Sequence, residues 1–181
     1  HRLERTALIP GEAPRPLPAD RPVEVELGCA DARFCMGRAA AHPETLLVGL
    51  DIREAFLEAA REDLVKLGLD NVWLEESNFL VDMDRLFEPE SVTRFFINFP
   101  DPWFKRRQRN RRWLTGEAVG HLARALKPGG ELLFQSDVWD LVLEALAVLE
   151  ACDDIANVRG PWTFHGDSPY EARSMREVIC T

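Results

Sequence analysis

Residues 95–112 read FFINFPDPWFKRRQRNRR, and the rest of the chain is arranged around this stretch. Its apolar start, Phe95–Ile97, is typical of a buried strand. Pro100 and Pro102 end that strand, because proline has no N–H for a sheet ladder and restricts the residue before it. Asp101 lies between the two prolines, so the sequence predicts a carboxylate held on a stiff turn just past the end of a strand.

A dense basic segment follows this turn. It comprises Lys105, Arg106, Arg107, Arg109, Arg111 and Arg112. The whole chain has a net charge of −9 and this segment carries +6, so the remainder carries −15. A positive patch on a negative background steers a polyanion to one face of a protein. The stretch therefore predicts chemistry beside a polyanion, and the alternative is a solvated basic loop without a partner.

Length and composition indicate one ordinary globular domain. The chain has 181 residues, of which 46% are hydrophobic and 29% are charged. No apolar run is long enough to cross a bilayer, so no membrane partner is predicted. The four cysteines form no CxxC pair, which argues against a zinc site or a disulfide framework and predicts no metal. A reducing cytoplasmic location, with the cysteines as small buried apolar residues, is the simplest interpretation.

The pattern of elements predicts a doubly wound α/β fold. Residues 1–22 carry five prolines and are expected to form a weakly ordered arm, ahead of a single domain over residues 23–181. Strands are expected at 23–27, 45–50, 71–75, 95–97 and 131–135, and helices at 33–41, 53–67, 82–87, 113–126 and 138–152. Final strands are expected at 155–158 and 175–180. Strand and helix alternate five times, which predicts a parallel sheet with helices on both faces.

Polar residues gather where the expected strands end. In doubly wound sheets, ligands bind beyond the carboxyl ends of the strands. The residues at these ends are Glu26, Gly28, Asp51, Asn78, Asp101 and Asp137. Clustered carboxylates repel one another, so such a set is costly unless ligands satisfy it. The alternative is that each acid caps the following helix, an interpretation that suits Asp31 and Asp137 best.

The loop after the first strand points to a particular kind of ligand. Gly28 and Asp51 lie 23 residues apart, near the interval at which an acid meets a ribose diol. Residues 28–33 read GCADAR and lack the GxGxxG pattern, which disfavours a diphosphate cradle and a nicotinamide oxidoreductase. An adenosine ligand without a diphosphate fits better. S-adenosylmethionine is the obvious such ligand, although the spacing alone does not establish it.

The segment PDPW at residues 100–103, followed by Lys105, Arg107 and the pair Arg111–Arg112, resembles the signature of bacterial tRNA (guanine-N7)-methyltransferases. Further motifs occur in the family's order, namely Glu26-Leu27-Gly28, Gly49-Leu50-Asp51, Asn71 with Asn78, Ser136-Asp137 and Ser168-Pro169-Tyr170-Glu171. The chain departs from the family in several places. It has Ala30 and Ala32 for glycines, Asp51 for Glu, Asn78 for Asp, Gln108 for His and Ser168 for Thr.

The resemblance implies a Rossmann-like class I methyltransferase sheet, mostly parallel with an antiparallel last strand. It implies S-adenosylmethionine as cofactor and tRNA as partner, with a monomer or a homodimer left open. The cofactor would be held by Glu26, Gly28, Asp51 and Asn78. The substrate guanine would be met by Asp101, Lys105, Asp137, Ser168, Tyr170 and Glu171. The tRNA backbone would be bound by Arg106, Arg107, Arg109, Arg111 and Arg112.

Asp101 is the implied catalytic residue. Guanine N7 has a free lone pair, so its methylation needs alignment and exclusion of water rather than a base. A carboxylate beside the purine can stabilise the positive charge that develops on it. Two alternatives remain open at this point: an RNA-binding module of the same fold without catalysis, and a methyltransferase that acts on a small molecule or a protein.

Overall fold

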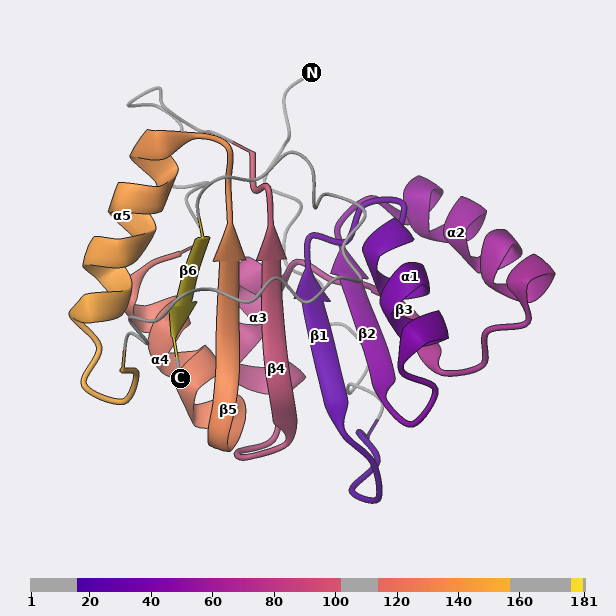
Figure 1. Ribbon diagram of the computed structural model, residues 1–181, viewed down its shortest axis with the longest axis horizontal. Helices are drawn as coiled ribbons and strands as arrows, with labels where there is room; N and C mark the ends of the chain where they lie inside the picture. Colours follow the sequence, from indigo (N-terminus) through magenta and orange to yellow (C-terminus); the bar gives the residue numbers. More distant parts are fainter. Residues whose placement is uncertain (1–15, 102–113, 157–176, 181) are drawn as a thin grey trace.

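The computed structural model describes residues 16–101, 114–156 and 177–180, which form an α/β sheet structure (Figure 1). The strands are β1 (Val23–Leu27), β2 (Leu46–Asp51), β3 (Val72–Glu76), β4 (Val92–Asn98), β5 (Leu126–Gln135) and β6 (Glu177–Cys180). The helices are α1 (Arg33–Ala41), α2 (Glu54–Leu67), α3 (Phe79–Leu86), α4 (Gly116–Ala125) and α5 (Trp139–Glu150). The helix and strand alternation predicted from the sequence is confirmed through α5.

The strands form one sheet in the order β3-β2-β1-β4-β5-β6. Strands β1 to β5 pair in parallel, whereas β6 runs antiparallel to β5, as the opposed arrows in Figure 1 show. This order runs outward in two directions from the neighbours β1 and β4. The doubly wound topology therefore places its point of reversal between these two strands, and their carboxyl ends open on the same edge of the sheet.

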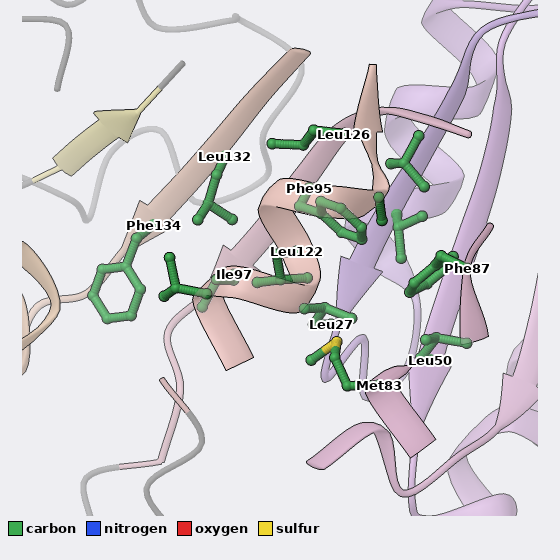
Figure 2. Close-up of a cluster of buried hydrophobic side chains, with 14 of the residues drawn as sticks. Leu27, Leu50, Met83, Phe87, Phe95, Ile97, Leu122, Leu126, Leu132 and Phe134 are labelled. Atoms are coloured by element: carbon green, nitrogen blue, oxygen red, sulfur yellow. The ribbon is translucent and has the colours of Figure 1, made fainter. Parts of the chain in front are cut away.

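Helices cover both faces of the sheet. On one face α3, α4 and α5 pack on alternate residues of the strands and form the larger core, part of which Figure 2 shows. The side chains labelled there are Leu27, Leu50, Met83, Phe87, Phe95, Ile97, Leu122, Leu126, Leu132 and Phe134. On the other face α1 and α2 pack on β2 and β3 around Leu47, Leu57 and Leu74. Both faces of β1 and β2 are buried, as parallel strands require.

Local sequence signals set several of the helix ends. Helix α2 ends at Leu67 and is capped by Gly68, the glycine predicted to stop it, which adopts a left-handed backbone (φ 66°) that closes the last turn. The hydroxyl of Thr115 accepts a hydrogen bond from the backbone N–H of Ala118 (3.2 Å) and so caps α4.

Asn71 has a structural role in the described part of the chain. Its buried side-chain amide donates to the carbonyls of Ala39, His42 and Thr45 at 3.0, 3.2 and 3.0 Å. These three residues lie at the end of α1 and before β2. Asn71 therefore ties the α1–β2 connection to the start of β3, at the end of the strands opposite the predicted ligand edge.

Several predicted boundaries differ from the structure, and β4 and α3 each begin three residues earlier than predicted, at Val92 and Phe79. Strand β5 begins at Leu126 rather than at residue 131, so the segment Lys127-Pro128-Gly129-Gly130 lies inside it. The pairing of β4 with β5 shifts register between Val92 and Arg94, and this irregularity accommodates the extra residues. A strand was also expected at 155–158. Residues 155 and 156 belong to no strand, and residues 157–158 lie outside the described residues.

Candidate active site

The reversal point between β1 and β4 brings together the first of the predicted site residues. Glu26 lies near the end of β1, and Asn98 is the last residue of β4. The side-chain amide of Asn98 donates to Oε1 of Glu26 at 2.9 Å. A direct hydrogen bond therefore links the strand that carries a predicted cofactor residue to the strand that leads to Asp101, three residues beyond Asn98.

Glu26 is buried, and none of the described residues that hydrogen-bond to its side chain is a cation. Only 3% of the residue is exposed. Its Oε2 atom accepts a hydrogen bond from Sγ of Cys35 in α1 (3.1 Å). Burial is the main effect on Glu26 and raises its pKa to about 7. The hydrogen bonds from Asn98 and Cys35 lower the pKa, and the negative charge of Asp31 raises it, but both effects are smaller than that of burial. This carboxyl group therefore titrates near neutral pH.

Glu24, two residues earlier on the same face of β1, is compensated differently. Its carboxylate pairs with the buried guanidinium of Arg38 in α1 and with Arg94 in β4, whose Nη1 lies 2.8 Å from Oε1 of Glu24. Arg94 also pairs with Glu131 in β5. These pairs connect α1, β1, β4 and β5 across the middle of the sheet, so Glu24 is neutralised within the fold.

Asp51 ends β2, and both of its oxygens are occupied. Oδ2 accepts from the backbone N–H of Ala30 (2.9 Å) and from Nη2 of Arg53 (3.0 Å). Oδ1 accepts from the backbone N–H and from Nε of Arg53, both at 2.9 Å. Burial alone would raise the pKa of Asp51, but the bonds from Arg53 and Ala30 outweigh it and hold the pKa below its usual range. Asp51 therefore stays ionised.

Arg53 lies between Asp51 and the predicted substrate residue Asp101 in its electrostatic interactions. The hydrogen bond with Asp51 raises the pKa of the Arg53 guanidinium, and the negative charge of Asp101 raises it further. The guanidinium also lies over the ring of Phe56, 4.5 Å from its centroid. Asp101 itself is exposed. The residues that end β2 and follow β4 are thus coupled electrostatically through one cation.

The loop between β1 and α1 keeps a backbone that usually requires glycine. Gly28, Ala30 and Ala32 all have positive φ angles, of 78°, 50° and 55°. The backbone N–H groups of Gly28 and Cys29 donate to the carbonyl of Leu50, which holds the loop against β2. The two alanines therefore preserve the left-handed turns at the cost of steric strain.

The remaining strand-end residues lie on the same edge. Asn78 is half-buried and precedes α3, and the backbone N–H of its neighbour Ser77 donates to the carbonyl of Asp51 (3.0 Å). Asp137 is exposed beyond β5. Asp137 does not cap α5, whose N-cap residue Val138 makes no side-chain cap. Asp31 pairs with Arg33 at the first turn of α1, and its Oδ1 also accepts a long hydrogen bond from the backbone N–H of Arg33 (3.5 Å), so the capping alternative holds weakly for Asp31.

Part of the predicted substrate site lies outside the described residues. These positions are Lys105, Arg106, Arg107, Arg109, Arg111, Arg112, Ser168, Tyr170 and Glu171. Within residues 16–101, 114–156 and 177–180, no group of three or more His, Cys, Asp or Glu side chains is placed to hold a metal ion. No helix in this part of the chain is long and apolar enough to span a bilayer.

The sequence interpretation missed three residues of this edge. Asn98 is a polar residue at a strand end, so the rule that found Glu26 and Asp51 could have found it. Arg53 follows Asp51 by two positions, but its contact with that acid depends on the local backbone. Cys35 gave no signal, because a cysteine among apolar residues of a helix is ordinarily a core residue.

The sheet order and the polar edge at β1, β2 and β4 define a doubly wound, Rossmann-like α/β fold. A SAM-dependent methyltransferase from Aquifex aeolicus has this fold, with a TM-score of 0.63 at 16% identity over 89% of this chain and 83% of that one. Within this class, the family model described as "Putative methyltransferase" matches residues 20–175. The chain belongs to the tRNA (guanine-N(7)-)-methyltransferase family.

Two relatives carry that family name. The tRNA (guanine-N(7)-)-methyltransferase of Synechocystis sp. is 34% identical over 163 residues, which cover 88% of this chain and 76% of the relative. The tRNA (guanine-N(7)-)-methyltransferase of Synechococcus elongatus is 39% identical over 128 residues, which cover 69% of this chain and 60% of the relative. The resemblance to this family that was stated from the sequence is thus confirmed.

The strain in the β1–α1 loop leads to a stability prediction. Ala30→Gly should stabilise the fold by about 0.5–1 kcal/mol, because glycine removes the left-handed strain but costs more backbone entropy. The matched control Ala59→Gly, at an exposed position inside α2, should destabilise it by about 1 kcal/mol. Urea denaturation measures both variants. Destabilisation by Ala30→Gly would show that the alanine is not strained.

The buried Glu26 predicts a particular pH dependence of stability. Its pKa is about 7 in the folded chain and 4.5 as a free group, so the folded state binds more protons between these values. The free energy of unfolding should therefore fall as pH rises from 4.5 to 7, by roughly 2–4 kcal/mol from this group. Glu26→Gln should lack this fall and be the more stable protein at pH 8.

Denaturant titrations of both proteins from pH 5 to pH 8 measure the difference between their free energies of unfolding. The contributions of the other titrating groups are the same in both proteins and cancel in this difference. Parallel curves for Glu26→Gln and the unaltered chain would contradict the placement of Glu26.

Proposed function

We propose that this chain transfers a methyl group from S-adenosylmethionine to N7 of a guanine in tRNA, in the variable loop as the family resemblance implies. The observation that carries the proposal is the joining of two sides at the reversal point, where Asn98 bonds to Glu26 and leads within three residues to Asp101. Membership of the tRNA (guanine-N(7)-)-methyltransferase family supports the substrate and the reaction.

The residues at the strand ends fit an adenosine cofactor with a cationic amino-acid tail. S-adenosylmethionine supplies a methyl group on a positively charged sulfonium, together with an ammonium group and a ribose diol. Glu26 suits the ammonium group, because its buried carboxylate has neutral hydrogen-bond donors and gains from a cation. Gly28 and the left-handed loop after it would contact the cofactor through backbone atoms and bring no charged side chain to it, which suits a ligand without a diphosphate.

Asp51 and Asn78 suit the ribose diol and the adenine. Asp51 is ionised and lies at the end of β2, next to the end of β3, where Asn78 presents an amide. A carboxylate offers about four acceptor positions, and Ala30 and Arg53 use them in the free chain. Binding of a diol there therefore requires the Arg53 guanidinium to release Asp51.

Asp101 acts on the guanine side. N7 carries no proton, so the residue has no proton to remove before the methyl group is transferred. Its exposed carboxylate, held between two prolines, stabilises the positive charge that forms on the purine and accepts hydrogen bonds from the guanine edge. The other residues proposed to meet the guanine are Lys105, Asp137, Ser168, Tyr170 and Glu171.

Replacement of Asp101 tests the catalytic assignment. Asp101→Asn and Asp101→Ala should each reduce 7-methylguanosine formation at least 100-fold and leave cofactor affinity within about threefold, since the lost group stabilises charge only in the transition state. Mass spectrometry of nucleosides from tRNA incubated with the chain and cofactor measures the product. The matched control Asp70→Asn removes an exposed carboxylate before β3 and should leave the rate unchanged.

The same experiment separates the alternatives. A product on tRNA that is not 7-methylguanosine, or label from the cofactor only in protein or small molecules, would reject the proposed substrate. Cofactor binding absent from calorimetry, with tRNA binding retained, would identify an RNA-binding module instead. Near-normal turnover by Asp101→Ala would remove this residue from the mechanism.

The basic segment predicts a strong salt dependence of tRNA affinity. Arg106, Arg107, Arg109, Arg111 and Arg112 are proposed to neutralise backbone phosphates, and each contact contributes up to about −0.9 to the slope of log K against log salt. A filter-binding titration should give a slope between about −3 and −5. The triple variant Arg107→Gln, Arg109→Gln, Arg111→Gln should reduce its magnitude by about 3. A tRNA affinity that does not change with salt concentration would show that the basic segment is solvated and does not bind the tRNA backbone.

A further inference from the structure

Cys35 contacts the carboxylate proposed to receive the cofactor's ammonium group. Its Sγ atom lies 3.1 Å from Oε2 of Glu26, and the residue is fully buried. It belongs to α1, where it packs in the same apolar cluster as Met36 and Leu57. The thiol is therefore both a core group and a polar neighbour of the site.

The direction of this hydrogen bond follows from the chemistry of the two groups. When Glu26 is ionised its carboxylate can only accept, so the thiol of Cys35 donates. Burial and the nearby charge of Glu26 both raise the pKa of the Cys35 thiol, so the thiol keeps its proton. Asn98 supplies the corresponding donor to the other carboxylate oxygen. Among the described residues, Glu26 is thus held by neutral donors, the Asn98 amide from β4 and the Cys35 thiol from α1. The backbone N–H of Cys35 also lowers the pKa of Glu26, and it is present in every Cys35 variant.

The charged groups around Glu26 do not replace these donors. Asp31 adds a like charge, and the buried thiol of Cys29 lies close enough to feel the charge of Glu26. The nearby cations Arg38 and Arg94 pair with Glu24. Loss of one neutral donor would therefore change the protonation state and the orientation of the Glu26 carboxyl group.

We propose that Cys35 is a positioning residue of the cofactor site, whose S–H group orients the Glu26 carboxylate and favours its ionised form for the ammonium group of S-adenosylmethionine. The inference rests on the proposed function for the identity of the ligand. The contact between Cys35 and Glu26 can be tested without it. Cys35 touches neither the cofactor nor the substrate in this role, and acts only through Glu26.

Two substitutions at this position separate the donor from the packing. Cys35→Ser keeps a donor, and Cys35→Ala removes it, while both reduce the volume of the side chain. Calorimetry with S-adenosylhomocysteine, which carries the same amino-acid tail, measures affinity between pH 5.5 and pH 8. In Cys35→Ala the pH midpoint of binding should rise by about 0.5–1 unit, which is a threefold to tenfold loss of affinity below the midpoint.

Cys35→Ser should keep the midpoint of the unaltered chain or lower it. The control Leu57→Val removes apolar volume from the same cluster without a hydrogen bond to lose, so it should reduce stability and leave the midpoint unchanged. A midpoint in Cys35→Ala equal to that of the unaltered chain overturns the inference. A shift of equal size in Cys35→Ser overturns it as well, because packing alone would then explain the effect.

A second measurement keeps the inference apart from the proposed function. The side-chain carboxyl of Glu26, assigned by its absence in Glu26→Gln, can be titrated by carbon NMR in the free chain. Its midpoint should rise in Cys35→Ala and not in Cys35→Ser. If the unaltered chain binds no S-adenosylhomocysteine at any pH, the proposed function fails, and the cofactor role of Cys35 fails with it. If S-adenosylhomocysteine binds and the Cys35 variants have the same pH midpoint as the unaltered chain, the inference about Cys35 is rejected and the proposed function stands.

Discussion

The burial of two carboxylates on one face of β1 is the constraint on which the rest of the structure depends. Glu24 and Glu26 are each almost inaccessible to solvent. An isolated buried carboxylate is costly, so each needs compensation. Glu24 receives it from the cations Arg38 and Arg94, which also connect α1 to β4. The described residues that bond to Glu26 are neutral donors. The first acid is therefore satisfied within the fold, and the second is the one proposed to bind the ammonium group of the cofactor.

The strand order brings Glu26 next to residues of a second strand and so forms the candidate site. Because β1 and β4 are neighbours at the reversal point, Glu26 lies within hydrogen-bond reach of Asn98, and β4 continues into the Pro-Asp-Pro turn. Arg53 makes a second link, since it bonds to Asp51 and feels the charge of Asp101. The proposed cofactor side and the proposed substrate side are thus linked by the Asn98–Glu26 hydrogen bond and, electrostatically, through Arg53. Occupation of one side is expected to alter the electrostatics of the other.

Much of this arrangement could be predicted from local patterns. Apolar runs that alternate with helical spacing predict β1 to β5, and the rule of strand carboxyl ends correctly gathers Glu26, Asp51 and Asn78 at one edge. Local rules failed where longer-range pairing decided the outcome. The Lys127-Pro128-Gly129-Gly130 segment has the composition of a turn, yet it lies within β5, because β4 pairs with Leu126 before it and with residues 131–135 after it. Ala30 and Ala32 adopt backbones that favour glycine, because the loop is anchored to Leu50 and Asp51.

The amino-acid sequence by itself determined the class of fold, the edge of the sheet at which the polar strand-end residues gather, and the family, since these follow from periodicity, strand-end chemistry and the PDPW motif with its basic segment. Only the tertiary structure decided how the two acids of β1 differ. Residues 24 and 26 are identical in type and share a face, so no local rule can separate them. Their different surroundings come from α1 and β4, which place two guanidinium groups beside Glu24 and a thiol and an amide beside Glu26.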